Sequence, residues 1–118
     1  MPTTVLIVDD HPSFRASARA LLEAEGYEVV GEAEDGASAL DAATALKPDV
    51  VLLDVQLPDL DGFQVAARLR DSNGHSPAVV LTSSRDGSDF GPLVADSGAR
   101  GFVAKAELSG AALAALLG

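Results

Sequence analysis

Short apolar runs, each followed by a polar side chain, recur along this chain. Continuous runs of this length are typical of strands that are buried on both faces of a parallel sheet. Because the carboxyl ends of parallel strands lie at one edge of the sheet, we expect the polar residues to converge there. The runs are Thr4–Val8 before Asp9 and Asp10, Val50–Leu53 before Asp54, Ala78–Leu81 before Thr82 and Ser83, and Gly101–Ala104 before Lys105.

Segments with helical spacing of apolar residues separate these runs. They predict helices over 12–25 and 63–71, and between them a helix whose apolar stripe runs from Ala39 to Leu46, with Asp35 or Ser38 as its cap. A weaker helix is expected over 89–97, where Gly91-Pro92 interrupts the first turn. A last helix is expected over 108–117, with Ser109 as its N-cap. Looser alternation over 27–33 predicts one further strand, nearer an edge of the sheet.

The predicted order is a strand followed by a helix, repeated five times, in a single domain that spans residues 1–118. Such alternation predicts an α/β fold, a doubly wound five-stranded parallel sheet with helices on both faces. The expected strand order is 2-1-3-4-5, the flavodoxin-like (βα)5 arrangement, in which the first and third strands are neighbours. Asp9, Asp10 and Asp54 would then share one crevice.

Composition narrows the possible functions. The 118 residues carry a formal net charge of -10, which argues against direct binding to nucleic acid or to an anionic membrane. Cysteine is absent, so disulfides and thiolate metal sites are excluded. The N-terminus shows no signal-peptide pattern, and no apolar run approaches the length of a membrane-spanning helix. We therefore expect a protein of the cytoplasm.

Three carboxylates in one crevice repel one another, and a hard divalent cation such as Mg²⁺ relieves that repulsion. A single acid at a strand end can simply cap the next helix, but three neighbouring acids favour a metal site. A carboxylate can also attack a phosphoryl group, and the ammonium of Lys105 would offset the charge that builds. A hydroxyl at Thr82 or Ser83 could bond a phosphoryl oxygen. His11 beside the acids could be a metal ligand, but we expect it to be a solvated residue at the helix start.

These motifs keep their order and spacing over essentially the whole chain, and together the chain resembles the receiver domain of a two-component response regulator. The matching segments are Val8-Asp9-Asp10, Leu53-Asp54, Leu57 to Gly62, Leu81-Thr82-Ser83 and Gly98 to Lys105.

The resemblance implies that Asp54 accepts a phosphoryl group from the phosphohistidine of a sensor histidine kinase. It also implies that Asp10, Asp54 and the carbonyl of Gln56 bind Mg²⁺, with Asp9 helping through water, and that Lys105 pairs with the phosphoryl group. The surface formed by the fourth helix, fifth strand and fifth helix would bind a downstream partner or a second copy of the chain. Phe102 falls at the family's switch aromatic.

The switch hydroxyl of the family has two candidates here. Counting forward from Pro77 gives Thr82, whereas counting back from Lys105 gives Ser83. We favour Ser83, because that count needs no insertion in the fourth helix. Ala106 stands where the family often has Pro, a form common in receivers of helix-turn-helix transcription factors, and Phe102 lacks the hydroxyl of a tyrosine switch.

Two other functions remain open. A phosphatase of the haloacid dehalogenase type also uses a strand-end Asp with Mg²⁺, but its second acid is missing from Asp54-Val55-Gln56. The segment Asp59 to Gly62 imitates that pattern and is better explained as a turn with helix-capping acids. A phosphate-independent interaction module is the other alternative. Because the sequence stops at Gly118, it is either a single-domain regulator or the receiver of a longer protein with an output domain.

Overall fold

The computed structural model describes residues 2–70, 76–84 and 91–117. One parallel sheet with the order β2-β1-β3-β4-β5 runs through the molecule, as predicted. Its strands are β1 Thr4–Val8, β2 Glu28–Ala33, β3 Val50–Asp54, β4 Ala78–Ser83 and β5 Gly101–Ala104. The helices are α1 Pro12–Ala24, α2 Gly36–Leu46, α3 Gly62–Arg70, α4 Gly91–Ser97 and α5 Gly110–Leu117, with a 3-10 turn at Lys105–Glu107. The flavodoxin-like (βα)5 fold is therefore confirmed.

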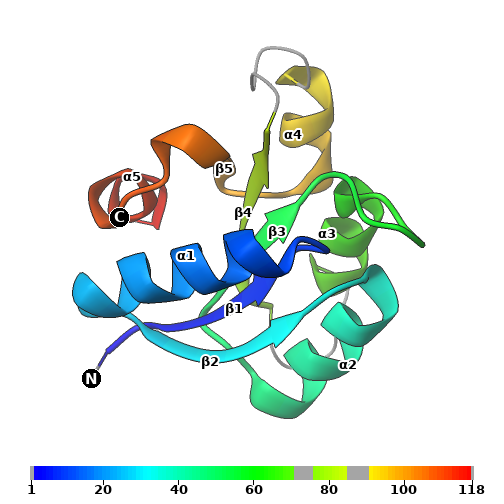
Figure 1. Cartoon of the computed structure of the whole chain (residues 1–118). Coiled ribbons are helices and arrows are strands. Elements are labelled where there is room, and N and C mark those ends of the chain that lie inside the picture. The colour runs from blue at the N-terminus through cyan, green and yellow to red at the C-terminus, as the bar shows by residue number, and fades with distance from the viewer. Residues whose placement is uncertain (1, 71–75, 85–90, 118) are drawn as a thin grey trace.

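Helices cover both faces of the sheet, with α1 and α5 on one side and α2, α3 and α4 on the other (Figure 1). Alternate residues of each strand enter opposite cores. Ile7 and Leu52 pack toward α1 and α5, whereas Leu6 and Leu53 pack toward α2 and α3. All five residues of β3 are buried, as the unbroken apolar run predicted.

The strand register brings the polar strand ends together. Val8 pairs with Leu53, Asp54 pairs with Thr82, and Ser83 pairs with Ala104. Asp9, which directly follows β1, therefore lies beside the end of β3, and Lys105, which follows β5, reaches Asp54 with its side chain. This register is what assembles a site from segments far apart in the sequence.

Two helix caps follow the sequence closely. Asp35 caps α2, because its Oδ1 accepts a hydrogen bond of 2.8 Å from the backbone N–H of Ser38, and Ser38 completes a capping box. Ser109 caps α5 by accepting a hydrogen bond of 3.0 Å from the N–H of Ala112. The α5 helix begins at Gly110 rather than at residue 108, because the chain first makes the 3-10 turn after β5.

Two further boundaries differ from the predictions. β4 continues through Thr82 and Ser83, because its ladder with β3 and β5 extends over both residues. The α4 helix begins at Gly91, so Pro92 stands at its second position. A proline in the first turn removes an N–H that has no partner within the helix, so the described part of α4 accommodates Pro92. The predicted helical residues 71, 89 and 90 lie outside the described residues.

Candidate functional site

The predicted acids meet at the carboxyl edge of the sheet. Asp9 follows β1 and is fully buried, and Asp54 ends β3 with 3% of its surface exposed. Oxygen atoms of Asp9, Asp10 and Asp54, with a ring nitrogen of His11, all lie within 4.8 Å of one another. Hard oxygen ligands at this spacing suit Mg²⁺, which binds one or two carboxylates and completes its shell with other oxygens.

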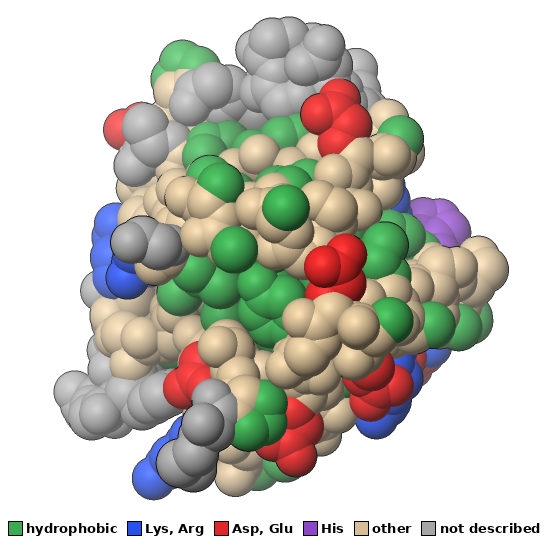
Figure 2. All heavy atoms as spheres, turned by 90° about the vertical axis from the view of Figure 1, so that its left-hand side faces the viewer, with side chains coloured by type: hydrophobic (Ala, Val, Ile, Leu, Met, Phe, Trp, Pro, Cys, Tyr) green, Lys and Arg blue, Asp and Glu red, His purple; other side chains and the backbone are tan. Residues whose placement is uncertain are grey.

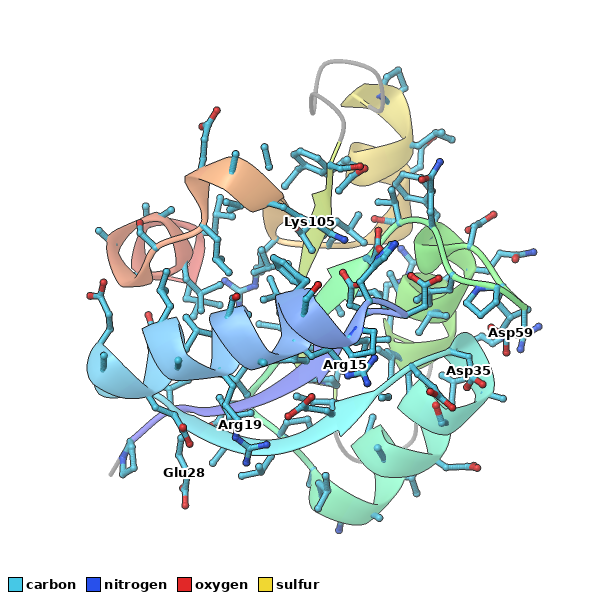
Figure 3. All side chains as sticks on the ribbon, in the orientation of Figure 1. Arg15, Arg19, Glu28, Asp35, Asp59 and Lys105 are labelled. Carbon is cyan, nitrogen blue, oxygen red and sulfur yellow. The ribbon has the colours of Figure 1, made fainter. Side chains whose placement is uncertain are left out.

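Lys105 reaches into this cluster from the end of β5 (Figure 3). Its Nζ lies 2.6 Å from Oδ2 of Asp9 and 3.3 Å from Oδ2 of Asp54. The ammonium therefore bridges the two buried carboxylates and stabilises their charges. Because the lysine directly follows the apolar run of β5, its position could be predicted from that run.

The pKa values of these groups follow from their contacts. Burial raises the pKa of the Asp54 carboxyl, and the charge of Asp9 adds to that rise. Burial also acts to raise the pKa of Asp9, but hydrogen bonds from Lys105 and His11 outweigh it, so the net pKa is lowered. Burial alone would lower the pKa of Lys105, and its hydrogen bond to Asp9 with the charge of Asp54 raises it instead. Asp54 is thus the carboxylate that gains most from a further cation.

His11 takes part in the cluster, although its side chain is exposed, as expected for a residue at a helix start. Its Nδ1 lies 2.9 Å from Oδ1 of Asp9 and 3.1 Å from Oδ1 of Asp10. The backbone N–H of His11 also donates a hydrogen bond of 2.8 Å to Oδ1 of Asp9. These contacts fix the turn between β1 and α1, and the place of His11 directly after the acids was their one sign in the sequence.

Arg15, which the sequence analysis did not single out, also holds this turn in place. Arg15 Nη1 donates a hydrogen bond of 2.6 Å to the carbonyl of Asp9, and its Nε lies 3.0 Å from Oε1 of Glu32 on β2. Arg19 lies one turn further along α1 (Figure 3), and its Nη1 is 2.7 Å from Oε2 of Glu32. The Asp9 backbone is therefore tied to the edge strand. The spacing of Arg15 and Arg19 on one helix face is the only signal the sequence carried.

The loop after β3 is held at both ends. The N–H of Gln56 donates a hydrogen bond of 3.1 Å to Oδ1 of Asp54, which places the Gln56 backbone against the cluster. Gly62 packs so closely on the carbonyl of Asp54 that a Cβ at this position would collide with it. The glycine is therefore required by the close approach of two backbone segments.

Both acids of the Asp59 to Gly62 segment act as helix caps, as expected. Asp59 accepts hydrogen bonds of 2.7 Å and 3.0 Å from the N–H groups of Gly36 and Ala37 at the start of α2. These hydrogen bonds lower the pKa of Asp59. Asp61 accepts a hydrogen bond of 2.8 Å from the N–H of Gln64 in α3. Neither acid belongs to the buried cluster, so the segment does not supply the second carboxylate that a phosphatase would need.

The two candidate hydroxyls face opposite sides of the sheet. Thr82 pairs with Asp54, and its side chain lies on the same face, because alternate residues of β4 point to opposite cores. Thr82 is fully buried, and its Oγ1 has no hydrogen-bond partner among the described residues. Ser83 is also buried but lies on the side of α2 and α3. The register therefore brings Thr82, and not the favoured Ser83, beside Asp54.

Phe102 lies on the same side of the sheet as Ser83. It pairs with Leu81 across the β4-β5 ladder and packs, partly exposed, on the core beneath α2 and α3.

Comparison with known proteins agrees with this geometry. Residues 5–116 match the response regulator receiver domain family, and the chain belongs to that family. It is therefore a receiver domain of a two-component response regulator. Its structure superimposes on a LuxR-family response regulator from Aurantimonas with a TM-score of 0.87 and 32% identity, covering 99% of this chain and 86% of that one. The receiver domain of NarL from Mycobacterium tuberculosis gives a TM-score of 0.85 and 40% identity, covering 99% and 98%.

Relatives found by sequence are transcriptional regulators. BvgA of Bordetella pertussis is 43% identical over 107 residues, which cover 91% of this chain and 51% of that protein. The DNA-binding transcriptional activator EvgA of Escherichia coli is 38% identical over 102 residues, covering 86% and 50%. The chain thus spans about half the length of these relatives. Within the described part of the chain, no helix has the length and apolar character needed to cross a membrane.

Proposed function

We propose that this receiver domain is switched by transfer of a phosphoryl group from a sensor histidine kinase to Asp54. The observation that carries the proposal is the setting of this carboxylate. It is buried at the sheet edge, its pKa is raised, and an ammonium lies 3.3 Å from Oδ2. Phosphoryl transfer depends mainly on positioning and on charge stabilisation, and this arrangement supplies both.

In the transfer, one carboxylate oxygen of Asp54 forms a bond to phosphorus as the bond between phosphorus and the imidazole nitrogen of the kinase breaks. The electron pair of the broken bond stays on that nitrogen, which then takes up a proton. Lys105 can turn from Asp54 toward a phosphoryl oxygen while it remains close to Asp9. Hydrolysis reverses the switch, because attack by water on phosphorus releases inorganic phosphate and restores the carboxylate.

The chain's own ligands for Mg²⁺ are the carboxylates of Asp10 and Asp54 and the carbonyl of Gln56, with Asp9 acting through water. The donor set fits the ion, because the clustered side-chain atoms are mainly carboxylate oxygens and lie within 4.8 Å of one another. When bound, Mg²⁺ neutralises charge on the carboxylates and on the phosphoryl oxygens. Lys105 compensates one negative charge, so the remaining acids still favour a cation.

We assign the switch hydroxyl to Thr82 rather than to Ser83. Thr82 has a buried Oγ1 without a hydrogen-bond partner in the described structure, on the sheet face of Asp54. A phosphoryl oxygen on Asp54 would supply that partner. Movement of Thr82 toward it would then be transmitted along β4 to Phe102 and to the surface of α4 and β5.

The downstream partner would bind the surface of α4, β5 and α5, either as an output domain, as a separate protein or as a second copy of the chain. The exposed part of α5 supports this, because the helix contains no polar side chain and Ala111, Ala114 and Ala115 are exposed. Figure 2 shows hydrophobic side chains gathered on this side of the molecule. The likeness to transcriptional regulators suggests gene control in the cytoplasm, with the receiver acting as a signalling module and not as an enzyme.

Intact mass spectrometry after incubation with Mg²⁺ and acetyl phosphate tests the proposal. We expect one phosphoryl adduct, which is absent from Asp54→Asn and absent when EDTA is present. A folded wild-type protein without any adduct would favour a phosphate-independent interaction module. Consumption of the donor without an adduct would favour a phosphatase.

A further inference from the structure

The ammonium of Lys105 has a third neighbour besides the two carboxylates. Phe14, in the first turn of α1, lies with its ring 4.6 Å from Nζ of Lys105, measured to the ring centroid. This is within the range of a cation–π interaction, in which the negative face of an aromatic ring attracts a cation. The contact joins α1 to the end of β5, which lie in opposite halves of the chain.

The surroundings of Nζ show what the ring can add. A lysine ammonium has three donors, and Asp9 and Asp54 occupy two directions at 2.6 Å and 3.3 Å. The ring of Phe14, with its centroid 4.6 Å from Nζ, is the third neighbour of the ammonium. A third carboxylate there would compete with an incoming phosphoryl group, whereas an aromatic ring attracts the ammonium without offering a strong acceptor.

We propose that Phe14 is a positioning residue for Lys105, which holds the ammonium at the sheet edge where a phosphoryl oxygen on Asp54 will arrive. This inference rests on the proposed function. Phe14 also packs on the core beneath α1 and α5, together with Ala18 and Leu22 at helical spacing. A role in packing alone would be met equally by leucine, so the aromatic character of residue 14 is what the experiment must isolate.

Two substitutions separate the ring from its volume. Phe14→Leu keeps an apolar side chain and removes the ring face, whereas Phe14→Tyr keeps the ring. We expect Phe14→Leu to slow phosphorylation by acetyl phosphate by about three- to tenfold, and Phe14→Tyr to stay within about twofold of the wild type. Leu21→Val is the matched control, because Leu21 packs on the same core from the same helix. The Leu21→Val variant should have a lower free energy of unfolding and should keep the wild-type rate of phosphorylation.

A double-mutant cycle tests the contact itself. The free energy of unfolding is measured for the wild type, Phe14→Leu, Lys105→Met and the double variant. We expect positions 14 and 105 to be coupled. Phe14→Leu should change the folding equilibrium constant by about twofold or more beyond the change that it causes in the Lys105→Met background.

The results separate this inference from the proposed function. A wild-type rate in Phe14→Leu, or an equal slowing in Phe14→Tyr, overturns the positioning role. The positioning role is also overturned if Phe14 and Lys105 show no coupling in a protein that still becomes phosphorylated. If the wild type takes up no phosphoryl group while the coupling is present, the proposed function fails and the contact between Phe14 and Lys105 stands.

Discussion

Thr82 lies directly opposite Asp54 in the register of β4 and β3, and its buried hydroxyl oxygen has no hydrogen-bond partner within the described residues. A buried polar group without a partner costs free energy, so such groups are few in folded proteins and each needs an explanation. A phosphoryl group on Asp54 would provide the missing partner. Phosphorylation of Asp54 would therefore remove the free-energy cost of the unpartnered Thr82 hydroxyl in the unphosphorylated protein.

Replacing Thr82 by valine should separate stability from signalling. Valine has nearly the same shape and no hydroxyl, so Thr82→Val should raise the free energy of unfolding by about 1 kcal/mol. Backbone amide NMR with beryllofluoride, a mimic of the phosphoryl group, gives the signalling readout. The shifts of α4 and β5 should respond in the wild type and in Ser83→Ala but not in Thr82→Val. Loss of the response in Ser83→Ala instead would restore Ser83 as the switch.

Asp9 and Asp54 should respond to pH with opposite signs. The folded-state pKa of Asp54 is raised, so its ionised form costs stability at neutral pH, and that cost disappears as the pH falls through the folded-state pKa. Asp54→Asn should therefore unfold at higher urea concentration than the wild type at pH 7, and the difference should shrink on acidification. Lys105 keeps its closer partner, Asp9, in this variant.

The pKa of Asp9 is lowered, so its stabilisation is present above the pKa of about 4 of an unfolded chain and is lost as the pH falls through the lower folded-state value. Asp9→Asn should lower the free energy of unfolding at pH 7 by about 2 kcal/mol or more, because it leaves Lys105 without its nearest partner. Urea titrations at several pH values, in EDTA, measure both variants. Equal signs for the two would contradict the assigned pKa directions.

The fold, and most of the site, could be predicted because both depend on where apolar runs end. The run before Asp54 and the run before Lys105 are strands with the predicted ends, and parallel pairing alone brings those ends together. The switch hydroxyl could not be settled by counting residues. Thr82 and Ser83 are both inside β4, and only the register shows which one faces Asp54.

Contacts between segments that are distant in the sequence could not be predicted from it. The helical spacing of Phe14 predicts an ordinary core residue. No neighbouring residue in the sequence indicates that its ring lies beside Lys105. The same is true of Asp59, which caps a helix that precedes it by more than twenty residues. Such pairs depend on how the finished helices and loops pack, which hydrophobic spacing does not encode.

Magnesium binding should depend on Asp10 although this side chain is not buried. Mg²⁺ binds the folded state, so it should raise the unfolding temperature of the wild type, and EDTA should reverse the effect. Asp10→Asn should weaken Mg²⁺ binding by at least roughly tenfold. Calorimetric titration measures the affinity, and Asp41→Asn, an exposed acid on α2, is the matched control. Unchanged affinity in Asp10→Asn would remove this residue from the ligand set.

Asp59 should stabilise the loop that carries Gln56. Asp59→Ala removes the acceptor of the Gly36 and Ala37 N–H groups, so the free energy of unfolding should fall. Asp59→Asn retains one carbonyl acceptor and should lose less. Because the pKa of Asp59 is lowered, the loss in Asp59→Ala should be largest above about pH 4 and should fade as acid protonates the wild-type carboxyl. A loss that does not change with pH would contradict a role for the charge.

The most direct test of the central claim is to locate the phosphoryl group. The protein is incubated with Mg²⁺ and acetyl phosphate, and the acyl phosphate is then reduced with borohydride, which converts a phosphorylated aspartate to homoserine. Peptide mass spectrometry identifies the converted position. We predict homoserine at position 54 alone, and none in Asp54→Asn. Homoserine at Asp9 or Asp10, or at no position in a protein that binds Mg²⁺, would contradict the account.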